Sequence, residues 1–244
     1  MTRAVIPARE RLIFAMDVPT PDAARKLADR LGDSVSFYKL GLELFMSGEA
    51  FPLLDTLAGR GKKIFLDLKL FDVPATVAGA VRNLKDRGVT FATVHGNQAI
   101  MEAAAGAAQG FGILAVTVLT SLDRGDLDDL GFDCDVEELV LSRARRALAA
   151  GCAGVVSSGL EAKMLRAGVE DRLIVVTPGI RPVENRPADD QKRVVSVQDA
   201  FANGADYIVV GRPIRDAADP RAAAESIQAT IAGLFAVNKG DAHL

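Results

Sequence analysis

One short stretch of the chain, residues 64–69, alternates between aliphatic positions and the set Phe65, Asp67 and Lys69. Because successive side chains of a strand point to opposite faces, these three share one face and the aliphatic residues share the other. A charged face opposite a wholly apolar one is typical of a barrel strand. Helices cover the outside of such a strand, and its inside opens at the carboxyl end into a polar site. Pro74 then ends the strand pattern.

Apolar stretches of this length recur along the whole chain. We expect strands at residues 11–17, 34–40, 64–69, 91–95, 111–118, 153–156, 173–177 and 206–210. Helical spacing of apolar residues, or helix start and stop signals, follows each of them. We expect helices that include residues 20–31, 54–57, 74–85, 101–103, 135–150, 161–165, 196–200 and 220–234. This alternation predicts parallel strands joined through βαβ units, and eight such strands can close into a barrel.

The predicted fold is a parallel eight-stranded (β/α)8 barrel, or TIM barrel, formed by residues 1–244 as a single domain with short flexible tails. A doubly wound open sheet is the alternative, because alternation alone does not report closure. The polar residues at the strand ends favour the barrel. The longest connection, residues 121–135, is acidic and rich in turn-forming residues. At its end, Asp135 and Glu138 predict a capping box for the next helix.

The composition is that of an ordinary globular protein, with 49% hydrophobic and 25% charged residues. The net charge of -3 and the lack of a basic run argue against a nucleic-acid partner. Cys134 and Cys152 are too few for a disulfide framework and too far apart for a paired metal motif. No signal peptide and no membrane-spanning apolar run is recognisable. We expect a soluble, cytoplasmic protein without a membrane partner.

Charged residues mark the carboxyl ends of the first three predicted strands. They are Asp17, Lys39, Asp67 and Lys69, with Asp72 on the loop just beyond. Functional side chains of barrels lie at these ends. The alternating signs let the cluster partly neutralise itself in a low-dielectric cleft, and flanking carboxylates stabilise an ammonium group between them. Solvated charges are the alternative for any single residue, but five at consecutive strand ends favour a site.

A glycine with an arginine close behind it follows each of the last two predicted strands, as Gly179 with Arg181 and Gly211 with Arg212. Barrels often build a phosphate site at this place from loop amides and a helix N-terminus. Glycines also end strands for steric reasons, but the repeated pattern favours phosphate binding. The polar loop at residues 179–192 is long enough to be a lid, with an unordered surface loop as the alternative.

Two further polar residues follow predicted strands. His95 could titrate near neutral pH, although a lone histidine is more often a hydrogen-bonded structural residue. Thr120 could hydrogen-bond a heterocyclic amide. No cluster of His, Cys and carboxylates has metal-ligand spacing, and two histidines do not support a Ser-His-Asp set.

The segment DLKLFDVPAT, residues 67–76, closely resembles the signature of the orotidine 5'-phosphate decarboxylase family. Further segments follow in the order of that family: AMD at 15–17, YKLG at 38–41, VTVLTS at 116–121, TPGIRP at 177–182, DQ at 190–191 and VGR at 210–212. Sugar-phosphate decarboxylases and synthases of the same suprafamily share the short Asp-x-Lys-x-x-Asp pattern. Its combination with Lys39, Gln191 and the two Gly-Arg loops is far more specific.

The resemblance implies decarboxylation of orotidine 5'-monophosphate (OMP) to uridine 5'-monophosphate (UMP), the last step of de novo pyrimidine nucleotide synthesis, without metal or organic cofactor. Lys69, held by Asp67 and Asp72, would stabilise and protonate the carbanion at C6. The resemblance also implies a homodimer in which Asp72 and Thr76 act in the site of the neighbouring subunit.

The resemblance further implies a division of the substrate contacts among the strand ends. Asp17 and Lys39 would contact the ribose hydroxyls, and Thr120 the pyrimidine. The residues expected at the phosphate end are Pro178, Arg181, Gln191, Gly211 and Arg212.

Two other functions remain open at the level of sequence. One is a magnesium-dependent sugar-phosphate decarboxylase or aldolase of the same suprafamily. The resemblance implies that enzymes of that kind carry an acidic residue at the end of the second strand, where this chain has Lys39, so Lys39 argues against this function. The other is a non-catalytic barrel that binds a nucleotide. Such a barrel would not need a lysine held between carboxylates.

Overall fold

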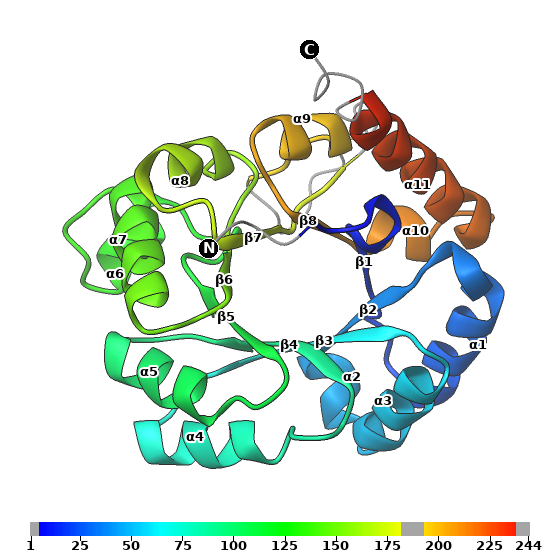
Figure 1. Cartoon of the computed structure of the whole chain (residues 1–244), viewed down its shortest axis with the longest axis horizontal. Helices are drawn as coiled ribbons and strands as arrows, with labels where there is room; N and C mark the ends of the chain where they lie inside the picture. Colours follow the sequence, from blue (N-terminus) through cyan, green and yellow to red (C-terminus); the bar gives the residue numbers. More distant parts are fainter. Residues whose placement is uncertain (1–4, 182–192, 238–244) are drawn as a thin grey trace.

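The structure is a computed structural model that describes residues 5–181 and 193–237. Its centre is a closed barrel of parallel strands in which each strand pairs with the next and the last pairs with the first (Figure 1). The strands are β1 (Leu12–Ala15), β2 (Phe37–Gly41), β3 (Lys63–Leu70), β4 (Val89–Val94), β5 (Gly112–Val116), β6 (Gly154–Val156), β7 (Ile174–Thr177) and β8 (Tyr207–Val210). The predicted (β/α)8 barrel is confirmed, and the open sheet is wrong.

Helices form a ring around the barrel (Figure 1). They are α1 (Pro21–Leu31), α2 (Leu42–Met46), α3 (Ala50–Gly59), α4 (Pro74–Arg82), α5 (Gln98–Ala107), α6 (Arg124–Asp129), α7 (Val136–Ala149), α8 (Ala162–Gly168), α9 (Val197–Ala202), α10 (Arg212–Arg215) and α11 (Pro220–Val237), with 3-10 turns at Ala8–Glu10 and Gly32–Ser34. Over the described residues, none of these helices combines the length and the apolar character needed to cross a membrane.

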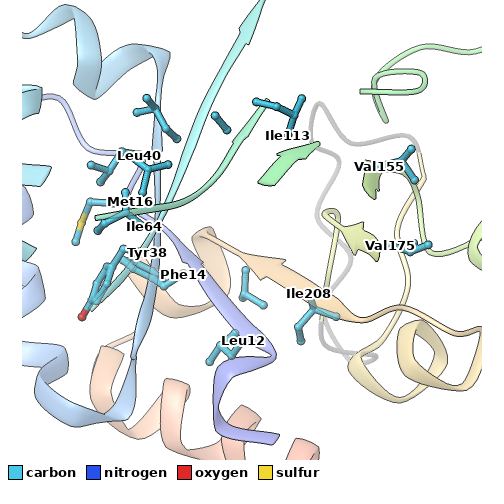
Figure 2. Packing of buried hydrophobic residues seen from close by; sticks show 14 of the residues in the cluster. Leu12, Phe14, Met16, Tyr38, Leu40, Ile64, Ile113, Val155, Val175 and Ile208 are labelled. Carbon is cyan, nitrogen blue, oxygen red and sulfur yellow. The ribbon is translucent and has the colours of Figure 1, made fainter. Parts of the chain in front are cut away.

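The apolar residues form two layers, as the period of the strands requires. Inside the barrel, Phe37, Phe65, Phe91 and Tyr207 pack with smaller residues of neighbouring strands. Outside the barrel, a larger cluster fills the space between strands and helices. Figure 2 shows part of this cluster, including Leu12 and Ile208. Full burial of one such side chain contributes about 1.5–3 kcal/mol relative to exposure. The position predicted for Phe65 on the inner face is confirmed.

The connection between β5 and α7 differs from the prediction. Asp135 precedes α7, but its side chain makes no capping hydrogen bond, so the capping box predicted there is wrong. The capping box lies earlier: the Asp123 carboxylate accepts from the backbone N–H of Asp126, and the Asp126 carboxylate accepts from that of Asp123. These two acidic residues stabilise the start of α6, which lies inside the segment that is rich in turn-forming residues.

Two other helices were missed for a local reason. The single helical stretch predicted after β2 is divided into α2 and α3 at Gly48, which has a φ of 94°. The short helix α10 directly follows Gly211, where the sequence indicated only a loop. Both elements are too short for a hydrophobic period to reveal them.

Candidate active site

A cavity of about 600 Å³ opens at the carboxyl ends of the strands. Because all eight strands are parallel, these ends meet at one mouth of the barrel. The predicted site residues that line the cavity are Asp17, Lys39, Asp67, Lys69, Thr120, Pro178, Arg181, Gly211 and Arg212. The structure therefore brings together residues from opposite ends of the chain, from Asp17 to Arg212.

Carboxylates and ammonium groups alternate along one side of this cavity. The Lys39 Nζ lies 2.9 Å from Asp17 Oδ1 and 3.6 Å from Asp67 Oδ2. The Lys69 Nζ lies 2.9 Å from the same Asp67 oxygen. Asp67 therefore joins two ammonium groups, and its side chain is only 12% exposed. Gly41 leaves room for the array, because a Cβ there would lie 3.1 Å from Lys39 Nζ and 3.2 Å from Asp17 Oδ1.

The mutual attraction of these groups outweighs the cost of burying them. Burial by itself raises the pKa of the Asp67 carboxyl, but Lys39, Lys69 and a hydrogen bond from Thr93 lower that pKa below its ordinary value. Burial by itself lowers the pKa of the Lys39 ammonium, but Asp67 and Asp17 raise it above its ordinary value. Asp67 and Lys39 are therefore charged at neutral pH.

The low pKa of Asp67 predicts an acid-dependent stability. Its ionised form stabilises the fold fully above the unfolded pKa of about 3.9, and this contribution is lost as the pH falls through the lower pKa of the folded state. As the pH is lowered, we expect the free energy of unfolding to decrease more steeply for the wild type than for Asp67→Asn. Denaturant unfolding measured from pH 6 downward, at about half-unit steps, tests this. A difference between the two proteins that stays constant with pH would contradict it.

The phosphate end of the predicted site lies beyond β7 and β8. Gly179 has a φ of 77°, the left-handed region that favours glycine. Gly211 allows close packing, because a Cβ there would lie 3.3 Å from the Cβ of Ala15. The backbone N–H of Arg181 donates to Val195 O at 3.0 Å, which brings together the two ends of the segment between them. Gln191 and most of the predicted lid, residues 182–192, lie outside the described residues.

Sequence reasoning missed a buried ion pair that fixes the far end of that segment. Arg193 donates to the Glu161 carboxylate and, at 2.8 Å, to the carbonyl of Leu119, the residue before Thr120. Burial raises the pKa of Glu161, while Arg193, Ser157 and the backbone of residue 158 oppose that rise. The pair connects the exit of β5 with the end of the segment after β7. The sequence carries no local signal for this ion pair, because its two residues are 32 positions apart.

Arg215 was missed as well, although it lines the cavity. Its guanidinium donates to the backbone carbonyl of Asp17 at 2.7 Å and pairs with Asp216. It therefore holds the turn that carries Asp17. The spacing of Arg212 and Arg215, three positions apart on one short helix, is the signal that could have indicated it.

Asp72 and Thr76 do not line the cavity of their own chain. Both are exposed, and Asp72 Oδ1 accepts from the backbone N–H of Val73 at 2.6 Å. The apolar side chains beside them are exposed too, Phe71 by 70% and Val73 by 62%.

His95 lies just after β4 with its ring edge-on to Phe71. Burial, with help from Arg143 and Lys69, lowers its pKa below the ordinary value, so the ring is neutral at pH 7. It does not line the cavity. Within residues 5–181 and 193–237, no group of three or more His, Cys, Asp or Glu side chains is arranged to hold a metal ion.

The closed barrel and the charged cavity at its carboxyl-terminal mouth place the chain among the barrel enzymes whose site is built from strand ends and the loops after them. It belongs to the orotidine 5'-phosphate decarboxylase / HUMPS family, whose sequence model matches residues 10–227.

Known relatives agree with this assignment. The chain is 68% identical over 231 residues to an orotidine 5'-phosphate decarboxylase of Methylococcus capsulatus, covering 95% of this chain and 96% of the relative. It is 54% identical over 235 residues to one of Xanthomonas oryzae pv. oryzae, with the same two coverages. The crystal structure of an orotidine 5'-phosphate decarboxylase from Lactobacillus acidophilus matches with a TM-score of 0.80 and 35% identity, over 91% of this chain and 99% of that one. The chain is therefore an enzyme of the carboxy-lyase class.

Proposed function

We propose that this enzyme decarboxylates OMP to UMP, in de novo pyrimidine synthesis in the cytoplasm, without a metal or organic cofactor. The observation that carries the proposal is the position of Lys69. Its ammonium group lies in the cavity at the barrel mouth, 2.9 Å from the buried Asp67 carboxylate. The names of the relatives supply the substrate.

Lys69 meets the central demand of this reaction. Loss of carbon dioxide from C6 leaves a carbanion without an electron sink, so the enzyme must supply on the order of 20 kcal/mol of transition-state stabilisation. An ammonium group fixed beside C6 stabilises that charge best where water is excluded. The same group then donates the proton that replaces the carboxylate at C6. Asp67, and Asp72 of a second chain, hold the ammonium group in place.

The other residues of the cavity divide the substrate among them. Asp17 and Lys39 bind the ribose hydroxyls, and the two side chains are paired with each other at 2.9 Å. Thr120, which follows β5, binds the pyrimidine. The phosphate binds at the loops after β7 and β8, through Pro178, Arg181, Gln191, Gly211 and Arg212.

The active enzyme is a homodimer in which Asp72 and Thr76 complete the partner's site. Support comes from their place outside their own cavity and from the exposed apolar residues around them. Phe71 and Val73, which flank Asp72 on both sides along the chain, are both exposed. Exposed apolar side chains in one region are typical of a surface that another protein covers.

The cofactor-free mechanism predicts that turnover survives chelation. A magnesium-dependent relative would use the signature carboxylates to hold the metal, whereas here two ammonium groups lie 2.9 and 3.6 Å from Asp67 Oδ2. We expect OMP consumption, followed by ultraviolet absorbance, to be the same in EDTA as in magnesium. Activity that vanishes in EDTA and returns with magnesium would contradict the cofactor-free proposal.

A further inference from the structure

The backbone of Lys69 has an unusual conformation for a strand. Its φ is 49°, in the left-handed region that residues with a side chain rarely adopt. Among the described residues, only Asp86 shares this property without being a glycine. Strained backbone of this kind persists only where the surroundings hold it.

The strain coincides with a break in the pairing of β3 with β4. Leu66 pairs with Ala92 and Leu70 pairs with Val94, so three residues of β3, 67 to 69, lie opposite the single residue Thr93 of β4. Such a bulge leaves backbone groups without their ladder partners and redirects side chains. It is located at the two residues that form the ion pair of the site.

The Thr93 hydroxyl supplies a partner for one of these backbone groups and also binds the Asp67 side chain. The backbone N–H of Lys69 donates to Thr93 Oγ1 at 2.9 Å, and Thr93 Oγ1 donates to Asp67 Oδ1 at 2.9 Å. The direction is fixed, because a backbone amide can only donate and an ionised carboxylate can only accept. Thr93 is fully buried, so no water competes for either bond.

The second bond orients the Asp67 carboxylate. With Oδ1 held by Thr93, the other oxygen, Oδ2, faces the ammonium groups of Lys69 and Lys39. The single hydroxyl group of Thr93 thus fixes both the backbone of Lys69 and the side chain of Asp67, with which the Lys69 ammonium group pairs.

We propose that Thr93 is a positioning residue for the reaction, holding Lys69 and Asp67 in the relative orientation that places the ammonium group at the reacting carbon. The proposal rests on the decarboxylation assigned above. It differs from a merely structural role, in which a buried hydroxyl only satisfies its own hydrogen-bonding demand. A structural role predicts lost stability with unchanged chemistry, whereas a positioning role predicts a lower kcat in folded enzyme.

Three variants separate these two roles. Thr93→Val keeps the branched shape and removes the hydroxyl, and Thr93→Ser keeps the hydroxyl. The matched control is Ser34→Ala, which removes a buried hydroxyl that donates to Leu31 O at 2.6 Å, ahead of β2 and therefore at the opposite end of the barrel. If Thr93→Val does not fold, Thr93→Ala replaces it, and equal kcat in the Ala and Ser variants would overturn the proposal.

For Thr93→Val we expect kcat for OMP to fall about 10- to 100-fold with little change in KM, the result of a misplaced catalytic group. The acid limb of its kcat profile should move to higher pH, because the hydrogen bond from Thr93 lowers the pKa of Asp67. Thr93→Ser should restore both values toward the wild type, and Ser34→Ala should change neither. A Thr93→Val enzyme with wild-type kcat and an unshifted acid limb would overturn the proposal.

Crystal structures of the wild type and Thr93→Val give a readout that needs no turnover. We expect the Lys69 φ to leave the left-handed region and the contact between Lys69 Nζ and Asp67 Oδ2 to lengthen beyond 2.9 Å. Retention of both would count against the role of Thr93. Wild-type enzyme that fails to consume OMP would instead count against the decarboxylation, so the two failures are distinguishable.

Discussion

Lys69→Ala is expected to lower kcat for OMP by about 10⁴- to 10⁷-fold, the combined effect of losing an electrostatic stabiliser and a general acid. UMP should bind to the variant nearly as tightly as to the wild type, because the contacts proposed for ribose, pyrimidine and phosphate come from other strand ends. Steady-state kinetics and calorimetric titration with UMP measure the two quantities.

Lys62→Ala is the matched control for this variant. Lys62 lies just before β3, at the opposite end of the strand from Lys69, where its ammonium group donates to the backbone carbonyls of Gly32 and Val35. Its loss should leave kcat unchanged. A Lys69→Ala enzyme as active as this control would contradict the catalytic role. Wild-type protein that binds UMP and never consumes OMP would support a non-catalytic nucleotide-binding barrel.

Mixing inactive Lys69→Ala and Asp72→Ala subunits is expected to regenerate activity. In a heterodimer, the barrel that carries Asp72→Ala keeps its own Lys69 and receives an intact Asp72 from its partner. Random exchange makes half the dimers heterodimers with one intact site of two, so activity should reach roughly a quarter of the wild-type value for a two-fold symmetric dimer.

The mixing experiment needs proof that the subunits exchange. Native mass spectrometry of subunits of different mass shows whether heterodimers have formed. Heterodimers without recovered activity would place Asp72 in the site of its own subunit. The exposed position of Asp72, outside the cavity of its own chain, leads us to expect recovery.

The charged face of β3 could be predicted from sequence because the period of a strand is local. Phe65 lies in the inner layer, and Asp67 and Lys69 line the cavity, as alternation requires. The presence of Asp17 and Arg212 in one cavity could also be predicted, because closure of parallel strands brings their carboxyl ends to one mouth.

Groups held by distant partners could not be predicted. Thr93 reaches Asp67 across 26 positions, and its role depends on a bulge that alternation does not reveal. The ion pair of Arg193 with Glu161 likewise has no signal in the sequence. The capping box failed differently: Asp135 has the required residue type and spacing, but Asp123 makes the bonds.

The most direct test of the cofactor-free decarboxylation is the reaction of purified wild-type enzyme with OMP, in EDTA, with UMP and carbon dioxide both quantified. One UMP and one carbon dioxide should form for each OMP consumed. Folded, UMP-binding enzyme that leaves OMP unchanged would contradict it.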